Sequence, residues 1–327
     1  SESGLLHALE QIEAEGGLSA RFVFLQCTSP LLQAEDIDGS LAHFEAESAD
    51  SLFSGARFFH FVWQADPHGG MIGVNHDKTS RPRRQDREAQ WVENGALYVL
   101  DTAGFRKAQH RFFGKTACYA MPPERALEID EPLDLLLAET AARAADTRAR
   151  LDLLPERPRA LIMDFDGVFT DNRVLVSESG EEAVTCSRGD GMGLDILRKF
   201  TDLRLCVISK EKNKVVKARC DKLQLECAHG IEDKLTLLRA WLDERGLDPA
   251  DCVYLGNDLN DIAPLSYVGC GAVVADALSQ PRAHAQLVLT HPGGHGAIRE
   301  LCELLLERLD INPEGTLPGS LPWTAQQ

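Results

Sequence analysis

Three aspartates crowd the end of an apolar segment of this sequence, at Asp164, Asp166 and Asp171. Carboxylates held this close repel one another, and a sequence shaped by stability alone would avoid the arrangement. A cation between them removes the repulsion, and carboxylate oxygens are ligands that Mg²⁺ prefers in proteins. The spacing therefore favours a divalent-cation site, although an acidic cap followed by a glycine turn is an alternative for the first two aspartates.

Further polar residues favour the cation site over a simple turn. A carboxylate beside Mg²⁺ can attack a substrate phosphorus, and a second carboxylate can donate a proton to the leaving oxygen. Asp164 and Asp166 have the spacing for these two roles. Asp258, from a distant segment, can complete the oxygen cage. The hydroxyl of Ser209 can contact phosphoryl oxygens, and Lys234 can neutralise charge that develops in the transition state.

A regular alternation of strands and helices must bring these residues together. Strands are expected at 160–166, 204–210, 252–258 and 271–276, and helices at 191–200, 213–223, 233–246 and 296–309. Strands separated by helices of this length pair in parallel, which predicts a doubly wound α/β sheet. Ligands bind at the carboxyl ends of such strands, which is where Asp164, Ser209 and Asp258 fall.

The first half of the chain also contains strand and helix patterns. Strands are expected at 21–30, 50–58 and 93–101, and helices at 1–17, 36–49 and 131–154. The Pro- and Arg-rich segment 155–159 breaks the last helix and marks a domain boundary. We therefore expect an α/β protein with a first domain at 1–154, a second at 155–312 and a C-terminal tail at 313–327.

Composition limits the classes of partner. The 327 residues carry a net charge of −17, which argues against a nucleic-acid-binding surface. No segment approaches the roughly 20 apolar residues of a membrane span. The nine cysteines include no CxxC pair, which is typical of reduced thiols. We expect a cytoplasmic protein that binds neither nucleic acid nor membrane.

Two segments of the first half could bind ligands. Arg81, Arg83 and Arg84 form a basic cluster that could bind an anion, and a solvated basic loop is the alternative. Glu128 and Asp130 have the i, i+2 spacing that places both side chains on one face of an extended segment, where they could hold a metal. Acidic residues favoured in the first turn of a helix are the alternative, and the spacing leaves both open.

The second half resembles the haloacid dehalogenase (HAD) superfamily. "DFDGVFTD" from Asp164, Ser209, Lys234 and "YLGNDLND" at 254–261 resemble its four motifs, in the same order. "TDNRV", "SRGDGMGLDIL" and "GGHGAIRE" extend the similarity over about 160–307, to the small capless branch that includes 3-deoxy-manno-octulosonate 8-phosphate phosphatase. Asn257 stands where many members of that branch carry an aspartate.

This resemblance implies a site and an assembly. Asp164 would be the nucleophile and Asp166 the acid and base, with Lys234 and Ser209 as the other catalytic residues. Mg²⁺ would be held by Asp164, Asp258 and the backbone carbonyl of Asp166. Asp261 would support this site and belong to the substrate-binding residues. Relatives are tetramers in which a neighbouring subunit helps to close the site, so we expect a homotetramer.

The first half resembles the acylneuraminate cytidylyltransferases (CMP-sialic acid synthetases) over about 5–140. The resemblance lies in "FLQCTSPLLQAEDID", "RRQD", "VENGALYVLD" and "MPPERALEIDEPLDLLLAE". It implies a partial nucleotide-diphospho-sugar-transferase-like α/β domain that joins CTP to a nine-carbon keto sugar acid. Members can carry a phosphatase-like domain at their C-terminus, so the two resemblances support each other.

This second resemblance implies particular ligand contacts. The residues are Gln26 and Ser29 near nucleotide and sugar, Arg84, Gln85 and Asp86 of "RRQD", Glu93 and Asn94 near the sugar acid, and Glu128 and Asp130 at a metal. The Gly-, Arg- and Lys-rich loop that holds the triphosphate in this family has no counterpart in the sequence. Such loops supply much of the electrostatic stabilisation in nucleotidyl transfer, so we expect this chain alone not to make a CMP-sugar.

The two resemblances together imply a function with two parts. We expect a cytidylyltransferase-family domain and an Mg²⁺-dependent phosphatase that removes the terminal phosphate of a 2-keto-3-deoxy sugar acid of eight or nine carbons. One alternative is that the second domain is a non-catalytic oligomerisation module. Another is that the chain acts only as a phosphatase, on these or on unrelated metabolites.

Overall fold

The computed structural model of the protein describes residues 2–312. It contains two compact units that divide between Ala145 and Asp146, inside helix α4 (Pro132–Asp152), whereas the boundary predicted from sequence follows that helix. The tail predicted at 313–327 lies outside the described residues. Within 2–312, no helix combines the length and the apolar character that crossing a bilayer requires.

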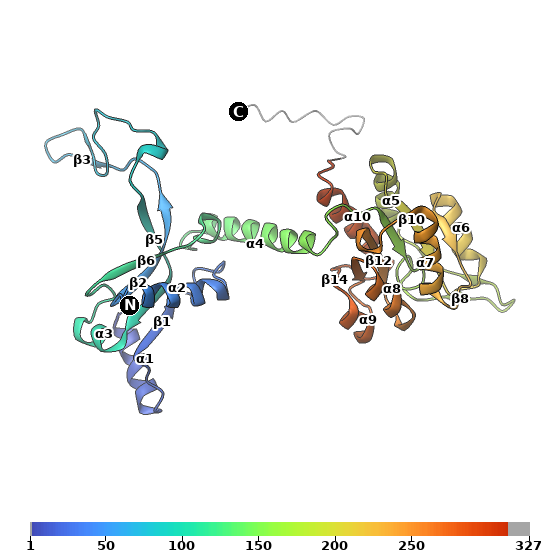
Figure 1. Ribbon diagram of the computed structural model, residues 1–327, viewed down its shortest axis with the longest axis horizontal. Helices are drawn as coiled ribbons and strands as arrows, with labels where there is room; N and C mark the ends of the chain where they lie inside the picture. The colour runs from blue at the N-terminus through green and yellow to red at the C-terminus, as the bar shows by residue number, and fades with distance from the viewer. Residues whose placement is uncertain (1, 313–327) are drawn as a thin grey trace. The chain divides into compact units, whose positions relative to one another are not determined.

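The second unit is built on a six-stranded parallel sheet, as the alternation of strands and helices predicts (Figure 1). Its strands are β7 (Ala160–Met163), β10 (Arg204–Ile208), β11 (Glu226–Ala228), β12 (Cys252–Gly256), β13 (Cys270–Val273) and β14 (Leu287–Val288). Their order in the sheet is β11-β10-β7-β12-β13-β14. The connections therefore reverse direction between β7 and β12, which is where a doubly wound sheet opens a ligand crevice.

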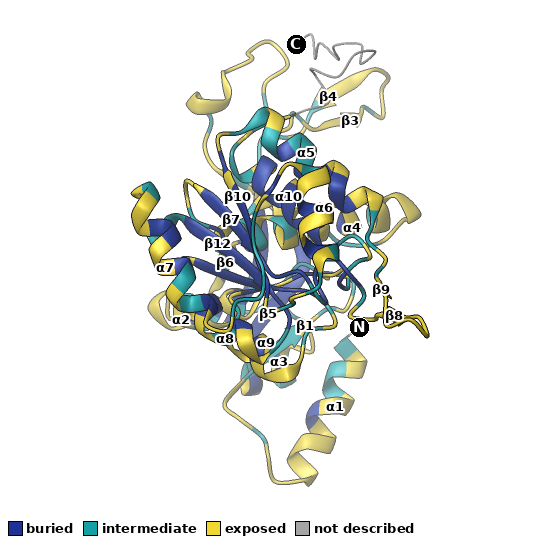
Figure 2. Cartoon of the chain, turned by 90° about the vertical axis from the view of Figure 1, so that its right-hand side faces the viewer, coloured by how far each residue is buried: buried dark blue, intermediate teal, exposed yellow. Residues whose placement is uncertain are grey.

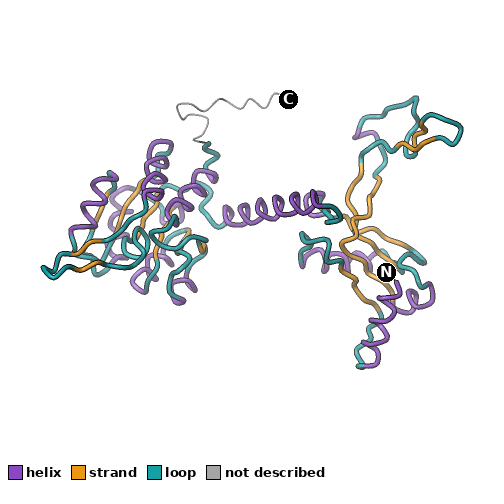
Figure 3. The backbone as a smooth tube through the Cα atoms, turned by 180° about the vertical axis from the view of Figure 1, so that it is seen from behind, coloured by secondary structure: helices purple, strands orange, loops and turns teal. Residues whose placement is uncertain are grey.

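Helices cover both faces of this sheet. They are α5 (Arg188–Phe200), α6 (Lys214–Leu223), α7 (Lys234–Arg245), α8 (Ile262–Tyr267), α9 (Ser279–His284) and α10 (Ala297–Arg308). Successive residues of β7 enter different cores, with Leu161 and Met163 packed beside α5 and α10 and Ile162 packed beside α7. Figure 2 shows β7, β10 and β12 buried, and Figure 3 shows these strands lying between helices.

Short elements of the second unit are absent from the sequence prediction. The edge strands β11 and β14 contain too few residues for an apolar periodicity to stand out. A hairpin of β8 (Leu175–Val176) and β9 (Glu182–Ala183) is also short, and its residues are exposed. Pairing with a neighbouring strand defines these segments, rather than their own pattern.

The first unit has a mixed four-stranded sheet in the order β1-β5-β2-β6. Its strands are β1 (Arg21–Leu25), β2 (Ser51–Phe58), β5 (Gln90–Asp101) and β6 (Thr116–Ala120), and its helices are α1 (Glu2–Ala14), α2 (Ala34–Ala46) and α3 (Thr102–Ala108). Only β2 and β6 pair in parallel. Figure 1 shows β2 and β5 continuing into an arm that ends in the hairpin of β3 (Trp63–Ala65) and β4 (Met71–Gly73).

Candidate active site

The turn after β7 carries the first two candidate catalytic residues. Asp164 follows the strand directly, and its N–H donates to the carbonyl of Leu255 in β12 at 2.9 Å. Gly167 has φ +75°, and a Cβ at this position would lie 2.0 Å from Nδ2 of Asn257. Only glycine fits this approach, which seats the turn containing Asp166 against the end of β12.

A small cavity of about 80 Å³ lies at this edge of the sheet. Four residues predicted from sequence line it, which are Asp164, Asp166, Ser209 and Asp258. They come from the ends of β7, β10 and β12, so the parallel sheet brings together residues that lie far apart in sequence. The remaining lining residues are Asn172, Lys210, Glu211, Asn257 and Asn260.

Lys234 lies directly behind this cavity and binds two carboxylates. Its ammonium is 2.7 Å from Oδ2 of Asp164 and 2.8 Å from Oδ1 of Asp261. All three side chains are almost completely buried, with Lys234 only 2% exposed. Lys234 is the first residue of α7, and the carboxylate of Asp233 caps that helix by accepting from Thr236 N–H at 3.0 Å.

The buried charges at this position do not balance. Asp164 and Asp261 contribute two carboxylates against the single ammonium of Lys234. Burial, followed by the carboxylate of Asp261, raises the pKa of Asp164 to about 7, although Lys234 partly opposes this shift. A divalent cation would favour the ionised form of Asp164, because it supplies the positive charge that the protein lacks here.

The residues around the cavity fit Mg²⁺. Asp164, Asp166 and Asp258 offer carboxylate oxygens, and Asn257 offers an amide oxygen. Oδ1 of Asn257 is buried and has no hydrogen-bond partner in the structure, so an acceptor is left for a cation to use. Among residues 2–312, no three His, Cys, Asp or Glu side chains form a ready metal cluster, so carbonyl or substrate oxygens would have to complete the set.

The surroundings of Asp166 suit proton transfer. Burial, followed by the carboxylate of Glu211, raises the pKa of Asp166 above its ordinary value. A raised pKa keeps more of a carboxylic acid protonated and able to donate. Across the cavity, the hydroxyl of Ser209 is buried and accepts from the N–H of Glu211 at 3.1 Å, which leaves the hydroxyl proton free to donate to an incoming oxygen.

Some cavity residues were not predicted from sequence. The sequence places Asn257 beside Asp258 at this edge but assigns it no role, whereas its free oxygen points to a ligand role. Its position directly after β12 was the available signal. Lys210 and Glu211 likewise follow β10, directly after Ser209. Asn172 has a positive φ of 62° and Asn260 lies in a short 3₁₀ turn, and neither feature distinguishes a ligand from an ordinary turn residue.

Two acidic residues of the motifs lie outside the lining of the cavity. Asp261 is completely buried, and its carboxylate accepts from Tyr254 Oη at 2.7 Å and from Asn257 N–H at 2.8 Å. It therefore supports the site from behind and does not face the space that a substrate would enter. Asp171, the third aspartate of the crowded segment, accepts from Arg173 N–H at 3.3 Å and is not in the lining.

In the first unit, the structure brings Gln26 and Glu128 together. Nε2 of Gln26 donates to Glu128 Oε1 at 2.9 Å, and the hydroxyl of Thr28 donates to the same oxygen at 3.2 Å. Ser29 is 4% exposed, and its hydroxyl has no partner in the structure. Asp130 is exposed and two residues from Glu128, and within residues 2–312 no hydrogen bond or ion pair joins its carboxylate to this group.

The other predicted residues of the first unit lie apart from this group. Arg84, Gln85 and Asp86 form an exposed 3₁₀ turn, in which Asp86 pairs with Arg83 at 2.8 Å. The guanidinium of Arg84 stacks 3.7 Å above the ring of Phe59. Glu93 accepts from the hydroxyl of Tyr98, while buried Asn94 accepts from the hydroxyl of Ser54 at 2.6 Å. Among the described residues, no hydrogen bond or ion pair joins these side chains to Glu128.

Most of the chain is similar to N-acylneuraminate cytidylyltransferases. The enzyme of Oncorhynchus mykiss is 32% identical over 289 residues, which are 86% of this chain. The match covers 66% of the trout enzyme, so this chain spans less than two thirds of that relative's length. No protein-family model matches the chain.

A second group of relatives matches about half of the chain. The 3-deoxy-D-manno-octulosonate 8-phosphate phosphatase KdsC of Escherichia coli is 34% identical over 152 residues, which cover 46% of this chain and 80% of that enzyme. The chain belongs to this phosphatase family. The family motifs in this chain are those that meet at the carboxyl edge of the second unit's sheet, around Asp164.

Solved structures of such phosphatases are also similar to part of the chain. That of Moraxella catarrhalis, determined with magnesium, phosphate and KDO, is 29% identical and covers 50% of this chain and 91% of its own, with a TM-score of 0.46. That of Yersinia pestis is 30% identical and covers 50% of this chain and 87% of its own, with a TM-score of 0.48.

Proposed function

We propose that the second unit is an Mg²⁺-dependent phosphatase that removes the terminal phosphate of a 2-keto-3-deoxy sugar acid. The observation that carries this proposal is the buried pair of Asp164 and Lys234, 2.7 Å apart, at the reversal point of a parallel sheet. Membership of the phosphatase family supports the reaction class, and the substrate named for the relatives supports the substrate class.

The residues of the cavity can perform this reaction in two steps. In the first, an oxygen of Asp164 forms a bond to phosphorus, the bond from phosphorus to the sugar oxygen breaks, and Asp166 donates a proton to that oxygen. In the second, Asp166 takes a proton from water, the water oxygen attacks phosphorus, and the bond to Asp164 breaks to release phosphate. Mg²⁺, held by Asp164, Asp258 and the carbonyl of Asp166 with Asn257 beside them, would neutralise phosphoryl charge.

The size of the cavity indicates which part of a substrate it holds. A volume of about 80 Å³ is far below the roughly 300 Å³ at which pockets begin to enclose whole small molecules. The cavity therefore suits the phosphoryl end, and the sugar would lie toward Lys210 and Asn260 at the exposed side.

Substitution of the nucleophile tests the proposal. Phosphate release from a phosphorylated 2-keto-3-deoxy sugar acid is measured with Mg²⁺ for the full chain and for Asp164→Asn and Asp171→Asn. We expect Asp164→Asn to lower kcat by about a thousandfold or more, because covalent catalysis is lost. Asp171→Asn is the matched control, and its rate should stay near that of the unsubstituted chain. Equal rates in all three proteins would favour the non-catalytic oligomerisation module.

A second candidate function, nucleotidyl transfer from CTP to a sugar acid, is to be tested against the expectation from sequence that this chain alone does not make a CMP-sugar. The trout relative carries the name of that activity, and Glu128 gathers Gln26 and Thr28 beside the unpartnered hydroxyl of Ser29. We infer a ligand site there. Pyrophosphate release from CTP by the full chain, compared with Glu128→Gln, tests it. The sequence leads us to expect no turnover, and release that Glu128→Gln abolishes would overturn that expectation and establish the site.

A further inference from the structure

The segment 290–296, between β14 and α10, lies directly on the turn that carries Asp166. The N–H of Gly294 donates to the carbonyl of Val168 at 2.9 Å. A Cβ on Gly293 would lie 1.9 Å from the carbonyl oxygen of Gly167. Backbone therefore packs on backbone without intervening side chains, and any displacement of 290–296 must move the turn.

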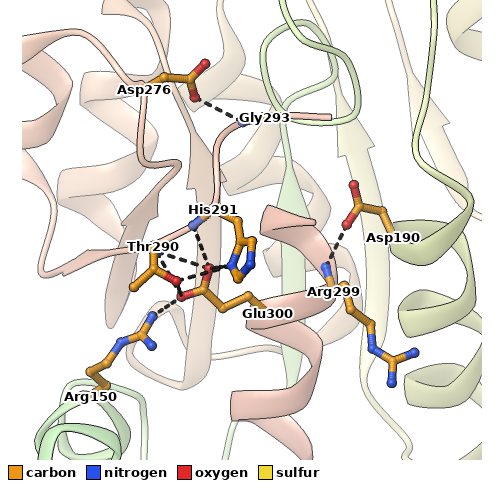
Figure 4. A network of polar contacts seen from close by, with 8 residues as sticks. All are labelled: Arg150, Asp190, Asp276, Thr290, His291, Gly293, Arg299 and Glu300. Carbon is orange, nitrogen blue, oxygen red and sulfur yellow. Dashed lines mark hydrogen bonds and ion pairs between the residues drawn. The ribbon is translucent and has the colours of Figure 1, made fainter. Parts of the chain in front are cut away.

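One buried carboxylate holds the beginning of this segment. Glu300, in the first turn of α10, is 9% exposed. It accepts from Thr290 N–H at 2.9 Å, from Thr290 Oγ1 at 2.9 Å, from His291 N–H at 2.9 Å and from His291 Nδ1 at 2.8 Å. Arg150, near the end of α4, donates to the same carboxylate from the opposite side (Figure 4).

Two more carboxylates hold the rest of the segment and the helix that follows it. Oδ1 of Asp276 accepts from Gly293 N–H at 2.9 Å, which fixes the residue that touches the turn. Oδ1 of Asp190 accepts from Arg299 N–H at 2.9 Å in the first turn of α10. Figure 4 shows that Glu300, Asp276 and Asp190 approach the loop and the start of α10 from separate elements. None of the three lines the cavity of about 80 Å³.

We propose that Glu300 is a positioning residue of the phosphatase site. By binding Thr290, His291 and Arg150 at once, it fixes 290–296, and this segment fixes the turn that aims Asp166 at the leaving oxygen. The kinetic part of this inference rests on the proposed phosphatase function, whereas the structural part does not. Arg150 also makes the end of α4 part of the same support.

Amide hydrogen exchange of the full chain tests the structural part. Glu300→Gln replaces one acceptor with an amide donor that faces the N–H groups of Thr290 and His291, so part of the network must break. We expect exchange in 290–296 and in 166–171 to accelerate by about tenfold or more. Glu303→Gln, one turn further on α10 and 58% exposed, should leave both segments unchanged. Unchanged exchange at 166–171 in Glu300→Gln would overturn the proposal.

Kinetics separate positioning from general stabilisation. Because Glu300 does not reach the cavity, Glu300→Gln should lower kcat by about ten- to a hundredfold while KM changes by less than about twofold. Glu300→Asp, which keeps the charge, should recover part of kcat. A loss confined to KM, or no recovery with aspartate, would contradict a positioning role.

A substitution at an exposed residue provides the test if Glu300→Gln does not fold. Asp276→Ala removes only the acceptor for Gly293 N–H and should give the same pattern of faster exchange at 166–171 and lower kcat. Normal exchange and normal kcat in Asp276→Ala would overturn the proposal in that case. If the unsubstituted chain releases no phosphate, the proposed function fails, and exchange at 166–171 alone decides the inference.

Discussion

At the scale of single residues, Lys234 explains how the crowded aspartates are tolerated. It is 2% exposed and pairs with Asp164 and Asp261, so one ammonium stabilises two carboxylates in a buried site. Removing one partner of a buried ion pair leaves an uncompensated charge, which costs much more than losing an exposed pair. Lys234, which contacts the proposed nucleophile Asp164, is therefore also part of the stability of the fold.

Lys234→Met should test this dual role. We expect the free energy of unfolding to fall by ~3–5 kcal/mol, because Asp164 and Asp261 are left buried without a cation. Lys199→Met is the control, since Lys199 is exposed, pairs with half-buried Asp195 and should change stability by less than ~1 kcal/mol. Urea unfolding monitored by circular dichroism measures both, and similar losses in the two variants would contradict the prediction.

The carboxylate of Glu300 should make stability depend on pH. Burial by itself raises the pKa of this group, but hydrogen bonds from Thr290, His291 and Arg150 outweigh burial and lower the pKa to about 2 from an ordinary 4.5. A lowered pKa stabilises the fold above the ordinary value, and this contribution is lost as pH falls toward the folded value.

The stability difference between the unsubstituted chain and Glu300→Gln should therefore be largest above pH 4.5 and should narrow as pH falls toward 2. Urea unfolding at a series of pH values measures the difference, in which the titration of other carboxylates cancels. A stability difference that stays constant over this pH range would show that the ionised carboxylate of Glu300 does not hold Thr290, His291 and Arg150 together.

At the scale of elements, loops rather than strands bring the turn that carries Asp166 to its final position. β7 delivers Asp164 to the edge of the sheet, but the contacts of Gly293 and Gly294 with residues 167–171 define where the turn lies. Glycine is required at 293 because any side chain would collide with backbone, which cannot move aside as the end of a flexible side chain can.

Gly293→Ala should accordingly damage both stability and activity. A Cβ there would lie 1.9 Å from the oxygen of Gly167, and overpacking of this kind costs ~1–3 kcal/mol. Gly189→Ala is the control, because its Cβ would lie 3.4 Å from Ser187 Oγ in the first turn of α5, where alanine is tolerated. Thermal unfolding and phosphate release measure the effects, and equal behaviour of the two variants would contradict this account.

At the scale of the whole molecule, the two units have separate hydrophobic cores. The core of the first unit includes Leu52, Leu97 and Val99, whereas the cores of the second unit lie on the two faces of its parallel sheet. No buried core residue among the described ones belongs to a cluster of the other unit. A packing defect in one core should therefore lower the stability of that unit and leave the stability of the other unit unchanged.

Leu52→Ala and Leu301→Ala should separate the stabilities of the units. Both side chains are completely buried, and truncation should lower the free energy of unfolding of the affected unit by ~2–5 kcal/mol. Below the unfolding temperature, Leu52→Ala should leave phosphate release unchanged. Calorimetry and phosphate release measure the outcome, and a loss of phosphatase activity in Leu52→Ala would show that the cores are coupled.

The sequence by itself determined the parallel architecture of the second unit and the set of polar groups at the carboxyl edge of its sheet. Apolar runs separated by helical segments predict parallel pairing, and parallel pairing brings the ends of β7, β10 and β12 together. Asp164, Asp166, Ser209 and Asp258 could therefore be predicted as neighbours, because each lies within three residues of the carboxyl end of a strand.

Only the tertiary structure decided which polar atoms are satisfied and which are free. The free oxygen of Asn257, the burial of Asp261 behind the cavity and the grouping of Arg150, Thr290 and His291 around Glu300 depend on contacts between distant segments. Local sequence patterns record periodicity and turn preference, whereas these contacts depend on how loops of different length close on one another. That closure also paired the short edge strands β11 and β14, whose own residues carry no clear strand signal.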